Sequence, residues 1–210
     1  MATLNYIQEL DIKLLVGIQN ALNADWLTPL MKGVSFLGDK GWFWILLCLA
    51  LILFKRTRRL GIICGISLGL AFLLCNGILK PLVDRTRPWV VSSAVNALIP
   101  PPGDASFPSG HANASMAAAW AFWINTGVKS TLVDTESLRR KLHTVAGCML
   151  VLTAAICLSR LYLGVHFPTD VLAGILVGAG SAAIVRKAYV IMQRRQSQRL
   201  RENMERDARG

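Results

Sequence analysis

No cysteine lies in the segments that connect the apolar runs of this sequence. A free cysteine inside an apolar run behaves as a small buried hydrophobe, and the spacing of these residues matches neither a disulfide framework nor a zinc site. We therefore expect no disulfide staple and no thiolate-held metal. The five positions are Cys48, Cys64, Cys75, Cys148 and Cys157.

Acidic residues are also scarce, with 12 Asp and Glu against 23 Lys and Arg and a net charge of +11. Asp84, Asp104 and Asp170 do not cluster along the sequence, so we expect no carboxylate cage around a metal. The basic residues form short clusters between long apolar runs, which argues against a nucleic-acid partner. The first 25 residues lack a basic leader followed by a continuous apolar stretch, so no cleavable signal peptide is expected.

Long apolar runs dominate the chain, which is 53% hydrophobic with a mean hydropathy of +0.46. Residues 60–79 carry no charge, and at ~1.5 Å per residue a helix over them spans ~30 Å, the thickness of a bilayer core. The sequence predicts an all-α integral membrane protein, a bundle of five transmembrane helices, or six if the N-terminal segment also crosses. The other four predicted spans cover residues 34–54, 112–128, 142–158 and 167–185.

Glycines recur at four-residue spacing within two of these runs, at Gly61, Gly65 and Gly69 and at Gly174 and Gly178. Such spacing lets helix backbones approach closely in lipid. Glycine is also simply frequent in membrane helices. Both interpretations stay open from the sequence.

Residues 1–33 are predicted to form an amphipathic segment at the membrane surface, followed by a transmembrane domain over 34–192 and a basic cytoplasmic tail over 193–210. In the first segment apolar residues recur at helical spacing, with polar residues on the other faces. The apolar residues are Ile7, Leu10, Leu14, Ile18 and Leu22, and the polar ones are Glu9, Asp11, Lys13 and Gln19.

Three basic segments fix the predicted topology in the plasma membrane, because short loops rich in Lys and Arg stay cytoplasmic. They are residues 55–59, 129–141 and 186–201. If the chain crosses the membrane five times, all three segments lie on the same side. Residues 80–111 and 160–168 then lie on the extracytoplasmic side. The C-terminal tail is expected in the cytosol, along anionic headgroups.

Residues suited to phosphate chemistry gather in the two predicted extracytoplasmic segments. Ser109 and Gly110 directly precede an apolar run, so we expect them at a helix N-terminus, where free N–H groups and the helix dipole favour an anion. Lys80 and Arg87 are seven residues apart, a spacing that shares a face if the segment is helical. A cationic clamp can stabilise a transferring phosphoryl group.

Two histidines complete this set. A histidine oriented by a carboxylate can attack phosphorus, and a second one can protonate the leaving group. His166 lies four residues before Asp170, and His111 follows Gly110. Taken singly, these charged residues have ordinary explanations as snorkelling anchors or helix-end charges, but together they indicate phosphoryl transfer.

These elements resemble the tripartite signature of the type-2 phosphatidic acid phosphatase family: Lys, six residues, Arg-Pro; then Pro-Ser-Gly-His; then Ser-Arg, five residues, His, three residues, Asp. All three are intact and in order. The resemblance implies a helical membrane phosphatase without a cofactor, in which His166 is phosphorylated, Asp170 orients it and His111 is the acid. The implied phosphate-binding residues are Lys80, Arg87, Ser109, Gly110 and Arg160.

Residues 98–111 and the short chain are similar to bacterial members of this family that hydrolyse undecaprenyl diphosphate, in peptidoglycan synthesis and bacitracin resistance. Phosphatidate, diacylglycerol pyrophosphate and phosphatidylglycerophosphate stay open as substrates, and so does phosphotransfer between two lipids. An anion transporter is the non-enzymatic alternative, which is expected to show broken helices at the bilayer midplane and internal repeats. His143 lies outside the signature and is assigned no role.

Overall fold

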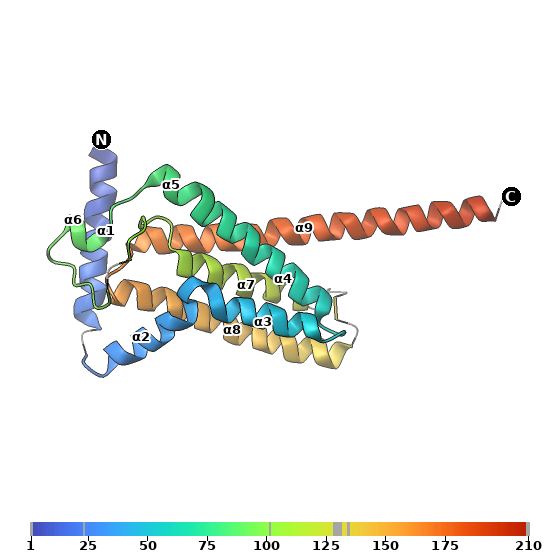
Figure 1. Ribbon diagram of the computed structural model, residues 1–210, viewed down its shortest axis with the longest axis horizontal. Helices are drawn as coiled ribbons and strands as arrows, with labels where there is room; N and C mark the ends of the chain where they lie inside the picture. The colour runs from blue at the N-terminus through green and yellow to red at the C-terminus, as the bar shows by residue number, and fades with distance from the viewer. Residues whose placement is uncertain (1, 23, 101, 128–131, 134, 209–210) are drawn as a thin grey trace.

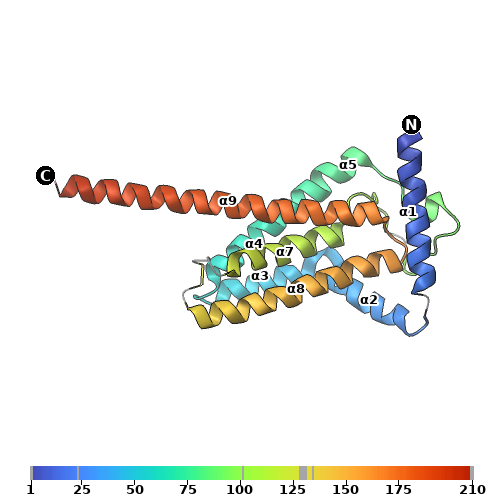
Figure 2. The same ribbon diagram turned by 180° about the vertical axis from the view of Figure 1, so that it is seen from behind.

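The computed structural model describes residues 2–22, 24–100, 102–127, 132–133 and 135–208, and the regular secondary structure in this part of the chain is all helical, without strands. Figures 1 and 2 show a bundle in which α9 runs far beyond the other helices. In chain order the elements are α1 (Ala2–Ala21), α2 (Leu27–Gly38), the 3₁₀ turn η1 (Asp39–Gly41), α3 (Trp42–Leu53), α4 (Arg58–Phe72), the π-helical η2 (Leu73–Leu79), α5 (Lys80–Val83), α6 (Pro88–Val91), α7 (Gly110–Thr126), α8 (Glu136–Tyr162) and α9 (Pro168–Asp207).

Helix α7 is the centre of the bundle and packs against α4, α8 and α9. Its middle is rich in alanine, and Ala117, Ala118, Ala119 and Ala121 are all buried. Small side chains on every face let three neighbours approach one helix closely. The sequence of α7 thus explains its central position.

Four helical segments are long and apolar enough to cross a membrane, and they are Leu27–Leu53, Arg58–Val91, Glu136–Tyr162 and Pro168–Asp207. The other predicted span corresponds to α7, which has 17 residues. The total of five spans stays a prediction. The predicted domain boundaries at residues 33 and 193 fall inside α2 and α9, so neither coincides with the end of a helix.

Helix α1 lies across the end of the bundle (Figures 1 and 2), and its polar and apolar residues differ in burial. Asp11, which lies outside the predicted apolar stripe, is 1% exposed, whereas Leu10 and Leu14 from that stripe are 46% and 49% exposed. Asp11 is buried because it pairs with a cation of the protein, while Leu15 packs into the core. Placement of α1 at a membrane surface stays a prediction.

The spaced glycines divide into two groups. Gly61, Gly174 and Gly178 lie at close helix contacts: a Cβ at Gly178 would lie 2.4 Å from the backbone oxygen of Asn113 in α7. A Cβ at Gly69 would meet nothing within 4 Å. The same spacing therefore allows close packing along α9 and near the start of α4, and leaves open space farther along α4.

Candidate active site

The helix N-terminus predicted at Ser109 and Gly110 is present, and its use as an anion site stays a prediction. Helix α7 begins at Gly110, with Ser109 as the residue before it, and Lys80 lies alongside, since a Cβ on Gly110 would be 3.9 Å from its Nζ. The hydroxyl of Ser109 is buried and has no hydrogen-bond partner among the described residues. A helix start, an unsatisfied hydroxyl and an ammonium group therefore meet at one point, which suits a phosphate oxygen.

Lys80 and Arg87 also converge, although not on one helical face as the spacing of seven suggested. Helix α5 ends at Val83, and Asp84 takes a left-handed conformation (φ 40°), so the chain turns between the two cations. Both cations bind the carboxylate of Asp104: Lys80 through Nζ, and Arg87 through Nη2 at 2.6 Å. Burial alone would raise the pKa of Asp104, but its pairs with the two cations outweigh this effect and lower the pKa to about 2.

The ring of His166 is 2% exposed, and its contacts define its protonation state. Nδ1 lies 2.9 Å from the carbonyl oxygen of Ser106, and Nε2 lies 3.4 Å from Nη1 of Arg87. A carbonyl can only accept and a guanidinium can only donate, so Nδ1 carries the proton and Nε2 presents a lone pair. Burial lowers the pKa of His166 to about 3, which keeps the ring neutral.

Asp170 lies close to His166, but the direct partner of Nδ1 is the Ser106 carbonyl. The Asp170 carboxylate is 3.7 Å from Nδ1. It accepts hydrogen bonds from the Ser106 hydroxyl at 2.5 Å and from the backbone N–H of Phe167 at 2.9 Å. Asp170 therefore holds the two segments that flank the ring.

Arg85 connects this carboxylate to the N-terminal helix. It donates to Asp170 at 2.6 Å and to Asp11 at 2.7 Å, and its guanidinium lies over the ring of Phe167 at 4.0 Å. Asp11 also accepts from the backbone N–H of Thr169 at 3.1 Å. The buried carboxylate on α1 thus has two partners beside the third signature element.

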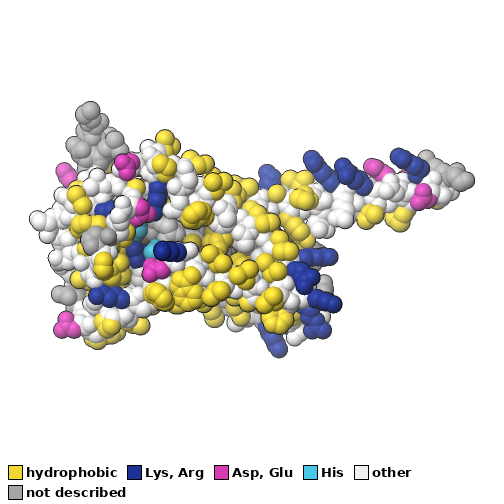
Figure 3. All heavy atoms as spheres, viewed as in Figure 1, with side chains coloured by type: hydrophobic (Ala, Val, Ile, Leu, Met, Phe, Trp, Pro, Cys, Tyr) yellow, Lys and Arg dark blue, Asp and Glu magenta, His cyan; other side chains and the backbone are white. Residues whose placement is uncertain are grey.

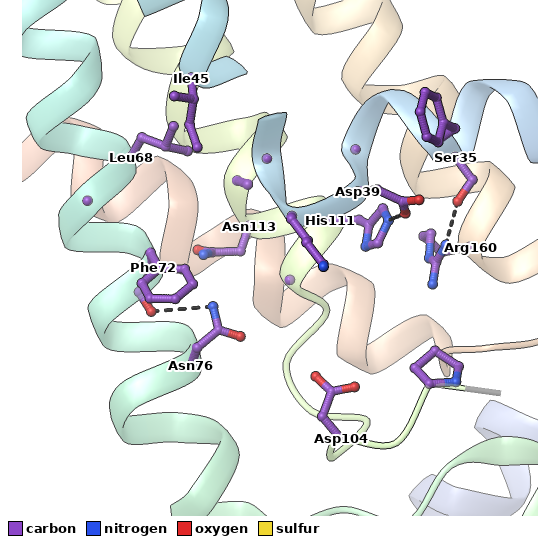
Figure 4. Close-up of a pocket in the computed structure, with 18 of the residues that line it drawn as sticks. Ser35, Asp39, Ile45, Leu68, Phe72, Asn76, Asp104, His111, Asn113 and Arg160 are labelled. Carbon is purple, nitrogen blue, oxygen red and sulfur yellow. Dashed lines mark hydrogen bonds and ion pairs between the residues drawn. The ribbon is translucent and has the colours of Figure 1, made fainter. Parts of the chain in front are cut away.

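His111 and Arg160 lie near each other, next to Asp39 and Ser35, as Figure 4 shows. Nε2 of His111 is 2.7 Å from Oδ1 of Asp39, and Arg160 donates to the hydroxyl of Ser35. Nε of Arg160 is buried without a hydrogen-bond partner in the described part of the chain. A donor remains available there for an incoming anion.

A cavity of about 1170 Å³ joins these groups to the bundle interior. Lys80, Asp104, His111 and Arg160 line its polar end. It continues between α3 and α4 along apolar side chains, including Ile45, Leu49, Leu68 and Phe72. Figure 3 shows acidic, basic and histidine side chains together in a hollow toward the α1 end, with hydrophobic side chains over much of the rest.

The eight predicted site residues lie in one region, but the sequence did not indicate four side chains that contact them, Asp39, Arg85, Asp104 and Ser106, or Asp11, which is linked to Asp170 through Arg85. Each lies in another segment or carries no chemical motif of its own. Arg85, Asp104 and Ser106 had one available signal, since all three lie inside segments already singled out. No group of three His, Cys, Asp or Glu suited to a metal occurs among the described residues.

A family comparison accounts for this arrangement: the model of the PAP2 superfamily matches residues 60–194. The chain belongs to the PAP2 superfamily. This PAP2 chain is 31% identical over 179 residues to an undecaprenyl-diphosphatase of Sulfolobus acidocaldarius, covering 80% of this chain and 79% of that one. It is 32% identical over 178 residues to a decaprenylphosphoryl-5-phosphoribose phosphatase of Mycobacterium tuberculosis, covering 83% and 88%.

The PAP2 fold is also found among solved structures. A transmembrane PAP2-type phosphatidylglycerolphosphate phosphatase from Bacillus subtilis has a TM-score of 0.68 at 24% identity, covering 87% of this chain and 86% of that one. These comparisons and the apolar helices establish an integral membrane protein and a phosphatase that hydrolyses phosphate esters.

Proposed function

We propose that this PAP2 phosphatase hydrolyses undecaprenyl diphosphate to undecaprenyl phosphate and inorganic phosphate, through a phosphohistidine on His166. The observation that carries the mechanism is the buried, neutral His166, whose Nε2 lone pair faces Arg87 at 3.4 Å. A buried imidazole with its Nδ1 proton engaged can use only Nε2 as a nucleophile. No metal ion or cofactor takes part in the proposed reaction.

In the first step Nε2 of His166 attacks the terminal phosphorus. The bond between phosphorus and the leaving oxygen breaks, its electron pair moves to that oxygen, and His111 supplies a proton to it. Water then attacks the phosphohistidine, its proton moves to His111, and the phosphorus–nitrogen bond returns its electrons to Nε2. The phosphate oxygens accept hydrogen bonds from the signature residues that have donor groups, which are Lys80, Arg87, Ser109, Gly110 and Arg160.

The cavity supports a lipid substrate. It extends from His111 past Leu49 and Leu68 toward the far end of α3, and at ~1.5 Å per residue this path follows the helix for well over 10 Å. Gly69 leaves the α4 wall open. A long apolar tail can therefore lie between α3 and α4 while its phosphate reaches the polar end. The undecaprenyl-diphosphatase relative of similar length favours a polyprenyl diphosphate.

The proposed site faces the extracytoplasmic side of the plasma membrane. The catalytic residues gather at the α1 end of the bundle, whereas Lys and Arg side chains gather at the opposite end and along the C-terminal half of α9 (Figure 3). By the preference of cationic loops for the cytosol, the C-terminus is then cytoplasmic. Undecaprenyl diphosphate released during envelope polymer synthesis would reach such a site directly.

The substrate is tested by phosphate release from purified full-length protein in detergent with EDTA. Separate assays contain undecaprenyl diphosphate, phosphatidate, diacylglycerol pyrophosphate or phosphatidylglycerophosphate. We expect the highest kcat/KM for undecaprenyl diphosphate, with EDTA having no effect. A higher value for any glycerophospholipid would replace the proposed substrate, and constant total lipid phosphate with exchange between lipids would indicate a phosphotransferase.

Asp104→Asn is expected to strengthen inhibition by inorganic phosphate, lowering its Ki about 3- to 10-fold. Asp104 occupies Lys80 and Arg87 and is 53% exposed, and partly exposed pairs are worth ~0.2–1 kcal/mol each. Because its pKa is about 2, the carboxylate stays ionised at every assay pH and competes with phosphate for these two cations. Phosphate inhibition curves measure the effect, with Asp25→Asn as an exposed control. A raised Ki would show that Asp104 helps to position the cations instead.

A further inference from the structure

His111 contacts a carboxylate that belongs to no signature element. Oδ1 of Asp39 lies 2.7 Å from Nε2 of His111, although the two residues are 72 positions apart. Both side chains line the polar end of the cavity (Figure 4). Asp39 therefore reaches His111 at the place where a substrate phosphate would enter.

The chain breaks its helix to present this carboxylate. Between α2 and α3, Lys40 and Gly41 have φ values of 51° and 70°, and a left-handed lysine persists only where the surrounding structure holds it. The residue before Asp39 also matters, because a Cβ on Gly38 would lie 2.7 Å from Cδ2 of His111. Because Gly38 has no side chain, the imidazole of His111 can lie against the interruption between α2 and α3.

The charges around His111 give Asp39 a specific task. Lys80 and Arg160 line the same cavity and repel a protonated imidazole. Asp104 also lines it, but its carboxylate is paired with Lys80 and Arg87. Asp39 is the carboxylate in hydrogen-bond contact with the His111 ring, and such a contact favours the charged form of the ring.

We infer that Asp39 is a positioning residue that orients His111 and stabilises its protonated form for transfer of the proton to the leaving oxygen. The inference rests on the proposed role of His111 as the acid. With Nε2–H held by Asp39, the proton that moves comes from Nδ1. As the phosphorus–oxygen bond breaks, its electron pair goes to the leaving oxygen, which bonds this proton. A neutral ring remains hydrogen-bonded to Asp39 and accepts a proton from water in the second step.

The leaving group provides a sharp test. Dioctanoyl phosphatidate expels an alkoxide that needs a proton, whereas p-nitrophenyl phosphate expels a stable phenolate that does not. Asp39→Asn keeps the shape of the side chain and removes its charge. We expect kcat/KM to fall about 10²-fold for dioctanoyl phosphatidate, within the range of general acid catalysis, and less than about 3-fold for p-nitrophenyl phosphate. The alkaline limb of the phosphatidate pH profile should move about one unit lower.

Controls separate this role from a structural one. Asp25→Asn, at an exposed position in the same N-terminal region, should leave kcat/KM unchanged for both substrates. In a His111→Gln background, adding Asp39→Asn should cost nothing further on phosphatidate, because the acid is already absent. Asp39→Glu restores the charge and should recover part of the phosphatidate rate even where the asparagine variant proves unstable.

Equal losses on both esters, or no loss on either, would overturn the inference. An additive loss in the His111→Gln background would do the same. These results leave the proposed substrate untouched, because both probes are simple phosphate esters. Conversely, failure of undecaprenyl diphosphate as a substrate leaves the role of Asp39 standing. If the wild type hydrolysed neither ester and released no phosphate from undecaprenyl diphosphate, the proposed function would fail and this inference with it.

Discussion

Replacing His166 with asparagine is expected to lower kcat/KM for lipid phosphate by at least about 10³-fold. The amide of asparagine can still donate to the Ser106 carbonyl, which accepts from Nδ1 at 2.9 Å in the wild type, but it has no nucleophilic lone pair at the position of Nε2. The acid, the phosphate-binding groups and the cavity all stay in place. Loss of activity would then report loss of the nucleophile rather than loss of the site.

A phosphoenzyme measurement makes this prediction specific. With ³²P-labelled substrate and rapid acid-free denaturation, the wild type should carry an acid-labile, alkali-stable label and His166→Asn should carry none. His143→Asn is the matched control, because His143 contacts Trp123 and Thr126 away from the site, and it should keep its label and its rate. A labelled His166→Asn protein would place the nucleophile elsewhere.

The sequence predicted the signature cluster because the chemistry of each element is encoded locally. Ser109 and Gly110 precede an apolar run, so a helix start with open amides follows from the run itself. His166 and Asp170 are four residues apart, and any turn that begins a helix at Pro168 brings them within a few ångströms; the structure has them 3.7 Å apart. Residues this close in sequence need little tertiary information.

The partners of these residues depend on the whole fold and were therefore missed. Asp11 pairs with Arg85 across 74 positions, and Asp39 meets His111 across 72. A lone aspartate has the same local signal whether it faces water or a partly buried arginine. Helix α1 shows this most clearly, since its periodicity gives two stripes, and in a membrane protein either stripe can face the rest of the chain.

Glycine spacing was similarly ambiguous, and the structure separates its two meanings. Close packing and open space both require the absence of a side chain. At Gly61 a Cβ would lie 2.8 Å from the Cβ of Leu51, so α3 and α4 touch there. One turn later Gly65 already lines the cavity, and at Gly69, two turns later, a Cβ would meet nothing within 4 Å. Glycines of one four-residue repeat thus allow α3 and α4 to touch at one end and leave room for the cavity between them at the other.

Gly178→Ala is expected to destabilise the protein strongly, by about 1–3 kcal/mol or more, as overpacking does in tight cores. The new Cβ would lie 2.4 Å from the backbone oxygen of Asn113 and 2.9 Å from the backbone nitrogen of Ala117. Backbone atoms inside α7 cannot rotate away, so α7 and α9 must separate. Gly174, one turn earlier on α9, is as close to the backbone oxygen of Ser109, at 2.6 Å. Separation at Gly178 would therefore move the start of α7, which carries His111, away from the start of α9.

Gly180→Ala, on the same helix, provides the control, because a Cβ there meets nothing within 4 Å. Alanine favours helix over glycine by up to about 1 kcal/mol, so this variant should be as stable as the wild type or slightly more stable. Thermal unfolding in detergent, monitored by the fraction of protein that stays monodisperse, compares the stability of the two variants. Phosphate release measures their catalytic activity. Opposite signs for two Gly→Ala changes two residues apart would show that contact with α7, rather than helix propensity, decides the outcome. Equal stability of the two variants would show that α7 and α9 do not pack backbone to backbone, and the relative placement of His111 and His166 would then need another explanation.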